Sequence, residues 1–310
     1  MNRPYPQSID LAGKLAIVIP VHNRSGFTRN CLEHLRNQTV RTFQTIVVDD
    51  GSVDGTAEMI QGDFPEVVLL HGNGSLWWTG ATNLGVKVAL GAGAAYILTL
   101  NDDTLPGPEF IENMMAAAAR NPGALIGAFA VDAGTGRPVF GGDRMDWLTA
   151  SAKDLLTDPT NPRMGLVEVT HYPGRGLLIP QEVFRRIGLF DSKYFPHYGA
   201  DYDFTLRARR HAFPIFCNYS AVLGIYPEAS GDAQNRKQKS AQNYYRHLFH
   251  IKGAANLKVF FWLAVRNCPK PLLPMCLPAG IARRIFGYLL DWVKEIYVNR
   301  EKRDASYRSA

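Results

Sequence analysis

Two polar clusters at the ends of apolar runs are the first candidates for chemistry in this sequence. Asp49 and Asp50 follow Thr45–Val48, a β-branched run that favours a strand buried on both faces. A second cluster, Asn101–Asp103, follows the apolar residues 96–100. Acidic clusters at neighbouring strand ends would repel each other unless a cation or hydrogen-bond donors lay between them. A divalent ion that carries a diphosphate meets this need, because magnesium and manganese favour carboxylate and phosphate oxygens. The alternative is that these aspartates cap the helices that follow.

The second half of the chain offers a basic and an acidic candidate. Arg175 lies between Gly174 and Gly176, a setting from which it would reach a phosphate; the alternative is an ordinary surface arginine. Asp201 and Asp203 open a segment with the pattern of an amphipathic helix. An aspartate at a helix start is commonly a cap. Residue type alone therefore does not decide whether Asp201 caps the helix or takes part in chemistry.

Alternating strand and helix patterns must position these residues. Apolar runs predict strands over residues 14–23, 45–50, 66–72, 94–104 and 123–132. Helical spacing predicts helices over residues 25–39, 82–93 and 108–121, with a further short helix capped near Ser52 or Asp54. This order predicts an α/β fold with a mostly parallel central sheet covered by helices on both faces. Ligands of such sheets gather at the carboxyl ends of the strands, where Asp49 and Asp50 lie.

Composition limits the class of protein without choosing its function. The 310 residues are 46% apolar and 20% charged, with a net charge of +6 and a pI near 9.1, which suits an anionic partner. Four cysteines without zinc-like spacing indicate a reducing compartment, so a cytoplasmic location is expected. No signal peptide and no membrane-spanning run are recognised.

Residues 231–310 differ in character and are predicted to form a helical, basic and apolar extension. Apolar residues alternate there with Arg283, Arg284, Lys294, Arg300, Lys302 and Arg303. Such helices fit a peripheral contact with an anionic membrane. The alternatives are packing on the rest of the chain or a homodimer. Basic and aromatic residues together also suggest nucleic acid, but no nucleic-acid motif supports that partner.

Four motifs in order resemble the nucleotide-sugar half of inverting family 2 glycosyltransferases with the GT-A fold. They are AIVIPVHNR, IVVDDGSVDGT, GATNLGV and ILTLNDDT, and the resemblance runs from about Leu15 to Tyr226. It implies that Asp50 hydrogen-bonds the base, while Asp49 supports the loop or binds ribose. Asp50 would be a fixed, charged acceptor for an N–H of a pyrimidine. The donor-binding residues implied in this way are Pro20, His22, Asn23, Asp49, Asp50, Asn83, Asn101, Asp102 and Arg175.

The same resemblance implies the metal and the catalytic base. The family's metal-binding triplet falls on Asn101–Asp103, so Asp103 is the expected ligand of Mn²⁺ or Mg²⁺, although the first carboxylate is an amide here. Asp201 corresponds to the catalytic base, with Ala200 in place of a preceding glutamate. The histidine found later in many relatives is absent, and Tyr226 and Glu228 occupy that neighbourhood. Tandem tryptophans in the segment Ser75–Gly80 suggest a loop that either stacks on a sugar or anchors itself in the core.

These observations predict an inverting glycosyltransferase. It would move a sugar from a UDP- or dTDP-sugar to a hydroxyl of a glycan or lipid-linked acceptor in bacterial surface-polysaccharide synthesis, with a rhamnosyltransferase-like character. The catalytic domain is expected over residues 1–230, with a nucleotide-sugar half at about 14–135 and an acceptor half at about 136–230. Attachment to the inner face of the plasma membrane is expected through the extension. The alternative is a non-catalytic sugar-nucleotide or glycan-binding module of the same fold.

Overall fold

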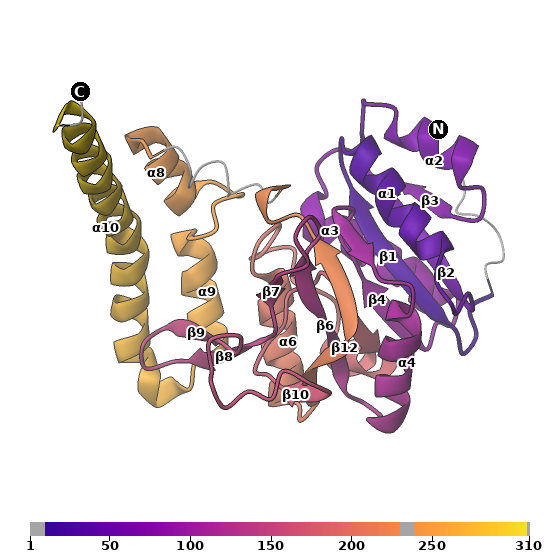
Figure 1. Ribbon diagram of the computed structural model, residues 1–310. Helices are drawn as coiled ribbons and strands as arrows, with labels where there is room; N and C mark the ends of the chain where they lie inside the picture. Colours follow the sequence, from indigo (N-terminus) through magenta and orange to yellow (C-terminus); the bar gives the residue numbers. More distant parts are fainter. Residues whose placement is uncertain (1–9, 230–238, 309–310) are drawn as a thin grey trace. The chain divides into compact units, whose positions relative to one another are not determined.

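Residues 10–229 and 239–308 are described by a computed structural model (Figure 1). The chain divides into two units, one formed by residues 1–145 and 152–229 and the other by residues 146–151 and 230–310. In the described part of the first unit, ten strands form one sheet. Its order is β10-β12-β6-β11-β4-β1-β2-β3, while β5 pairs with β12 and β7 pairs with β6.

The strands of this sheet are β1 (Leu15–Val21), β2 (Phe43–Asp49), β3 (Val68–His71), β4 (Tyr96–Thr99), β5 (Thr104–Pro106), β6 (Leu125–Asp132), β7 (Pro138–Phe140), β10 (Leu166–Glu168), β11 (Leu177–Pro180) and β12 (Ile215–Ile225). A separate hairpin joins β8 (Asp143–Asp146) to β9 (Ser151–Asp154). Pairing is parallel across β4, β1, β2 and β3, whereas β11 runs antiparallel to both β4 and β6. The predicted α/β fold is confirmed, and its sheet is mixed.

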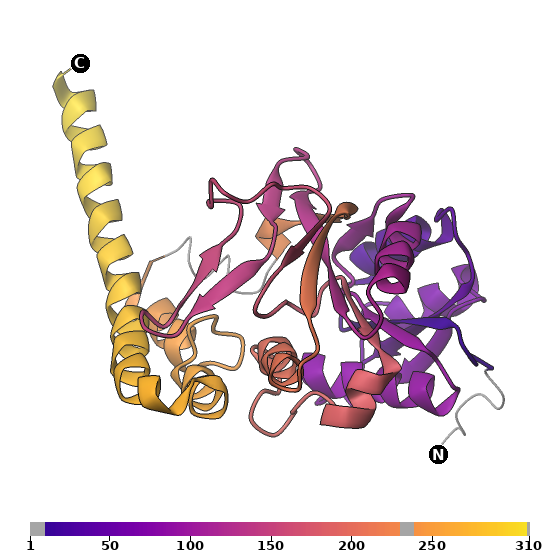
Figure 2. The ribbon, with the colours of Figure 1, turned by 90° about the horizontal axis from the view of Figure 1, so that it is seen from below.

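The helices of the first unit are α1 (Ser25–Arg36), α2 (Thr56–Asp63), α3 (Trp77–Gly91), α4 (Phe110–Arg120), α5 (Gln181–Ile187) and α6 (Ala200–Arg210), and a short 3₁₀ turn, η1 (Pro227–Ala229), follows β12. Helices lie on both faces of the sheet (Figures 1 and 2). Alternate residues of β1 point to opposite faces. Ile17 and Ile19 join a core cluster that includes residues of α1, α2 and α4, while Val18 faces α3.

Two expectations about local structure are corrected. The tandem tryptophans do not lie on a loop, because Trp77 and Trp78 are the first residues of α3. The strands that carry the two acidic clusters are not neighbours, because β1 lies between β2 and β4. The end of β1 therefore separates the clusters.

The second unit contains helices α8 (Ala241–Phe249), α9 (Leu257–Asn267) and α10 (Leu273–Arg308), with a 3₁₀ turn, η2 (Lys270–Leu272), before α10. Side chains of Ser240 and Asn256 cap α8 and α9 by accepting backbone N–H bonds. Phe260 packs with buried residues of α9 and α10 in a small apolar cluster. Among the described helices, none combines the length and apolar character needed to cross a bilayer.

Close packing of α3 on the sheet generates a stability prediction. A Cβ at Gly85 would lie 2.5 Å from Val18 Cγ1, a methyl group of a stiff β-branched residue, whereas a Cβ at Gly91 meets nothing within 4 Å. We expect Gly85→Ala to lower the free energy of unfolding by about 1 to 3 kcal/mol through overpacking. Gly91→Ala should leave it unchanged or raise it by up to about 1 kcal/mol. Chemical denaturation measures both, and equal stability of the two variants would contradict this packing.

Candidate active site

The end of β1 organises the polar groups at this edge of the sheet. His22 Nδ1 donates to the Asp50 carbonyl at 2.7 Å, and His22 Nε2 accepts from Asn23 Nδ2 at 3.0 Å. Asn23, in a left-handed conformation with φ of 54°, also bonds the loop after β2 through Ser52 Oγ and the Val53 N–H. Pro20 precedes them in β1, paired with Val48. The strand ends of β1 and β2 are thus fastened together.

Both oxygens of Asp50 are already used by the backbone that leads into α3. Oδ1 accepts from Gly74 N at 2.8 Å and Oδ2 accepts from Trp77 N at 3.0 Å. Asp49 is also buried, and its Oδ1 accepts from Ser52 N at 3.0 Å. Asp50 therefore has a structural role that the sequence did not indicate, and any bond to a ligand must use its remaining lone pairs.

Arg24 neutralises the second acidic cluster. Its Nη1 lies 3.1 Å from Asp102 Oδ1 and 2.8 Å from Asp103 Oδ2. Burial raises the pKa of the Asp102 carboxyl to about 7, although Arg24 acts in the opposite direction. Arg24 is not among the residues predicted from the sequence; its position directly after the end of β1 was the available signal. A cation was expected between the two acidic clusters, whereas Arg24 pairs with the two carboxylates of the second cluster alone.

Asp102 and Asp103 offer oxygen ligands to a divalent ion. Asp102 Oδ2 is buried without a hydrogen-bond partner, so a hard oxygen ligand is present, and Asp103 is partly exposed beside it. Within the described residues no group of three or more His, Cys, Asp or Glu side chains is placed to hold a metal. The pair fits an ion that takes further ligands from a bound phosphate, and such an ion would have to displace Arg24 Nη1.

Asn101 and Trp78 form the link between the acidic cluster and the second half of the unit. Trp78 Nε1 donates to Asn101 Oδ1 at 2.9 Å. The indole packs so closely on Gly174 that a Cβ there would lie 2.4 Å from Trp78 Cζ2. Trp78 also meets Phe190 edge to face. One tryptophan of the tandem pair is therefore the anchor, and the amide at Asn101 has a fixed partner.

Asp201 lies at the start of α6 with its carboxylate held by two backbone groups. Oδ2 accepts from Gly174 N and Oδ1 accepts from its neighbour Tyr202 N, both at 2.9 Å. Burial raises the pKa of the Asp201 carboxyl, while these two bonds act against that rise. A half-buried carboxylate with a raised pKa is suited to accept a proton.

Arg175 stands on the same loop as Gly174 and acts electrostatically on Asp201. Its Nε is buried and has no hydrogen-bond partner in the described part of the chain. A buried guanidinium nitrogen without a partner is costly. An anionic ligand at this position would remove that cost.

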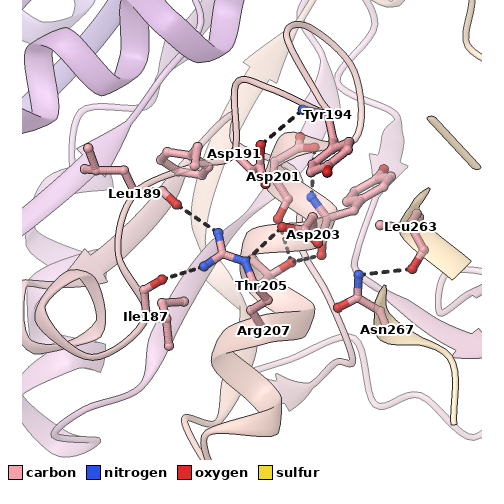
Figure 3. Close-up of polar contacts among 12 residues, drawn as sticks. Ile187, Leu189, Asp191, Tyr194, Asp201, Asp203, Thr205, Arg207, Leu263 and Asn267 are labelled. Carbon is pink, nitrogen blue, oxygen red and sulfur yellow. Dashed lines mark hydrogen bonds and ion pairs between the residues drawn. The ribbon is translucent and has the colours of Figure 1, made fainter. Parts of the chain in front are cut away.

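The Asp203 carboxylate has different partners from that of Asp201, which lies two residues earlier. It is fully buried and accepts from Arg207 Nε at 2.8 Å, while Arg207 also donates to the carbonyls of Ile187 and Leu189 (Figure 3). Asn83 likewise has a structural contact, because both ends of its amide bond the backbone of Phe190. Through these contacts the two side chains hold residues 187–190, at the end of α5 and directly after it, in place.

Comparison with known sequences gives a family match. The profile described as "Glycosyl transferase family 2" matches residues 16–188. The uncharacterized glycosyltransferase YibD of Escherichia coli K12 is 32% identical over 108 residues, which is 34% of this chain and 30% of that protein. The match thus covers about a third of that relative's length.

Two solved structures show the same fold. Residues 1–349 of S. aureus TarS align with a TM-score of 0.54 and 14% identity over 89% of each chain. A structure of GalNAc-T7 with UDP, GalNAc and Mn²⁺ aligns with a TM-score of 0.56 and 13% identity over 73% of this chain and 47% of that one. At such identities the likeness shows the fold alone.

The place of Arg24 between two carboxylates predicts how the site binds metal. Arg24→Ala should strengthen Mn²⁺ binding by about 10- to 100-fold, because the ion no longer has to break charge-assisted hydrogen bonds of about 1.5 to 3 kcal/mol. Calorimetry over a range of alkaline pH values measures the affinity, because burial raises the pKa of Asp102 to about 7 and the loss of Arg24 would raise it further. Arg29→Ala is the control, since Arg29 pairs with Asp63 at the surface. Equal Mn²⁺ affinity in both variants would show that the ion does not displace Arg24, and no binding by either variant would contradict a metal site at Asp102 and Asp103.

Proposed function

Because this chain belongs to glycosyl transferase family 2, we propose that it transfers a sugar with inversion from a UDP- or dTDP-sugar to a hydroxyl of a glycan or lipid-linked acceptor. One observation carries the proposal: the Asp201 carboxylate is fixed by Gly174, next to Arg175 with its partnerless Nε. Transfer from a nucleoside diphosphate requires a proton acceptor and an anion contact close together, and the bond from Gly174 N brings the Asp201 carboxylate at the start of α6 to the loop that carries Arg175. Bacterial surface-polysaccharide synthesis is the proposed context.

The donor is proposed to lie across the ends of β1, β2 and β4. Pro20, His22 and Asn23 border the nucleotide, and the carboxylates of Asp49 and Asp50 meet the ribose and the base. Arg175 binds the diphosphate from the other side. Asn83, whose amide is bonded to Phe190, contributes by positioning α3.

Asp201 is the proposed general base. It accepts the proton of the acceptor hydroxyl while the hydroxyl oxygen forms a bond to the anomeric carbon and the bond to the diphosphate breaks. The anomeric configuration inverts in this single displacement. Burial favours the role because it raises the pKa of Asp201 and makes the carboxylate a stronger base.

The diphosphate leaves with negative charge that must be neutralised. Arg175 and Arg24 supply fixed positive charge close to it. When bound at Asp103 and Asp102, Mn²⁺ or Mg²⁺ would add further neutralisation of the leaving group. A metal in the GalNAc-T7 structure, which shares the fold, supports this part of the proposal.

Replacing Asp201 by asparagine tests the base directly. The amide keeps one oxygen acceptor but cannot take a proton at neutral pH, so turnover should fall about 10²- to 10⁴-fold while nucleotide affinity is retained. One of the two backbone bonds is lost, which should lower stability by about 1 to 3 kcal/mol. Steady-state transfer, calorimetry with UDP and thermal melting give the three readouts.

Asp203→Asn is the matched comparison. It breaks a buried ion pair with Arg207, so it should cost about 3 to 5 kcal/mol of stability while turnover per folded molecule changes little. Near-normal transfer by Asp201→Asn would contradict the role of Asp201 as general base, and Glu228 and His197 would be the next candidates. Asp232, another acidic residue of this region, lies outside the described residues.

A non-catalytic binding module of the same fold is the second candidate. Several polar groups of the site, including both Asp50 oxygens, hold the protein itself together. Release of UDP or dTDP from a sugar donor by the purified protein would favour the enzyme. Tight nucleotide-sugar binding with no release or transfer would favour the module.

The second unit is proposed to attach the protein to the cytoplasmic face of a membrane. On α10, exposed apolar residues recur at helical spacing, and Arg283 and Lys294 border them on one side. The stripe consists of Phe286, Leu290, Val293 and Tyr297, and Met275 and Ile296 of the same helix are also exposed. The side chains of Arg300, Lys302 and Arg303 lie outside the described ones.

Vesicle binding tests this attachment. Phe286→Glu and Leu290→Glu should each weaken binding to phosphatidylserine-containing vesicles about 10- to 100-fold, which corresponds to about 1.5 to 3 kcal/mol for one buried apolar side chain. Val53→Glu is the control, since Val53 is exposed on the first unit. Loss of a dimer with unchanged vesicle binding would instead identify this stripe as a contact between two copies.

A further inference from the structure

The two tryptophans at the start of α3 have opposite surroundings. Trp78 is held by Asn101 and by contact with Gly174. Trp77, by contrast, leaves 37% of its surface exposed. A large aromatic residue beside a polar site usually covers apolar surface or binds a ligand. Trp78 already fills the space between Asn101 and Gly174, so packing at that place does not explain why Trp77 is partly exposed.

The backbone at Trp77 is held in a conformation that a side chain disfavours. Its φ is 56°, in the left-handed region that glycine adopts without cost. The Trp77 N–H is fixed there by Asp50 Oδ2. Strained residues of this kind persist where the surrounding structure enforces them, commonly at ligand-binding sites. The enforced turn fixes the point at which the partly exposed indole leaves the backbone, next to the Asp50 carboxylate.

The surface around Trp77 leads directly to the proposed base. Thr79 fastens the start of α3 to the segment before α6, through Oγ1 to the Phe195 carbonyl and through its N–H to the Pro196 carbonyl. The Trp77 ring then meets His197 edge to face at 5.9 Å between centroids, and His197 contacts Tyr198 at 4.6 Å. Asp201 follows three residues after Tyr198. An aromatic surface of Trp77, His197 and Tyr198 therefore lies between the Asp50 loop and α6.

We propose that Trp77, with His197 and Tyr198, forms a stacking platform for a pyranose ring of the acceptor. A sugar ring presents apolar C–H groups on its face, which matches the exposed indole of Trp77 beside the partly exposed rings of His197 and Tyr198. The acceptor hydroxyl must reach Asp201, and the platform precedes α6, where Asp201 lies. The inference rests on the proposed function and narrows the acceptor to a molecule that carries a sugar.

Fluorine NMR of protein labelled with 5-fluorotryptophan tests the platform without requiring transfer activity. The chain has five tryptophans, and the resonance missing from Trp77→Phe identifies Trp77. Methyl pyranosides of glucose, galactose, N-acetylglucosamine and rhamnose are titrated with UDP present, with glycerol as a control polyol. We expect at least one pyranoside, and not glycerol, to shift the Trp77 resonance. An equal shift with glycerol, or no shift with any pyranoside, would overturn the proposal.

Two variants separate binding from packing. Trp77→Gly removes the ring and relieves the backbone, so its melting temperature should stay equal or rise while affinity for the active pyranoside falls about 10- to 100-fold. Trp77→Phe keeps an aromatic face and should lose less than about 10-fold. A lower melting temperature with unchanged pyranoside affinity would make Trp77 a packing residue. UDP binding distinguishes the two claims: if UDP binds and pyranosides do not, the platform fails and the proposed function stands.

Discussion

The position of the Trp78 indole is the constraint on which the site depends. Its N–H is bonded to Asn101 at the end of β4, and its ring lies against Gly174, whose N–H holds Asp201. One rigid side chain thus sets the separation between the acidic cluster and the proposed base. A smaller residue would free the Gly174 loop, and a larger residue at Gly174 has no room.

Other residues along α3 also fix the position of the elements around the site. Thr79 bonds the segment before α6, Asn83 bonds the backbone of Phe190, and Gly85 allows the helix to lie directly on Val18. One helix therefore joins the proposed nucleotide side to the proposed acceptor side. Charge is balanced locally, because Arg24 Nη1 contacts the carboxylates of both Asp102 and Asp103. Arg175 Nε has no hydrogen-bond partner among the described residues, so it can bind an anionic ligand.

Much of the fold could be predicted because it follows from local patterns. Apolar runs that end in polar residues located β1, β2 and β4, and helical spacing located α1, α4 and α6. Contacts between distant residues could not be predicted from spacing. Arg24 meets Asp102 across 78 positions, and Asn83 meets Phe190 across 107. The loop predicted for the tryptophan segment was wrong, since the Trp77 N–H bonds Asp50 and α3 begins at Trp77. Which carboxylate oxygens were already occupied was equally invisible in the sequence.

A crystal structure with UDP bound would test the central claim most directly. The account predicts the diphosphate within hydrogen-bond distance of Arg175 and beside Asp103, the uracil next to the Asp49 and Asp50 carboxylates, and Asp201 facing the diphosphate across the space for a sugar. UDP bound elsewhere on the chain, or bound with Arg175 and Asp201 turned away from it, would contradict the account.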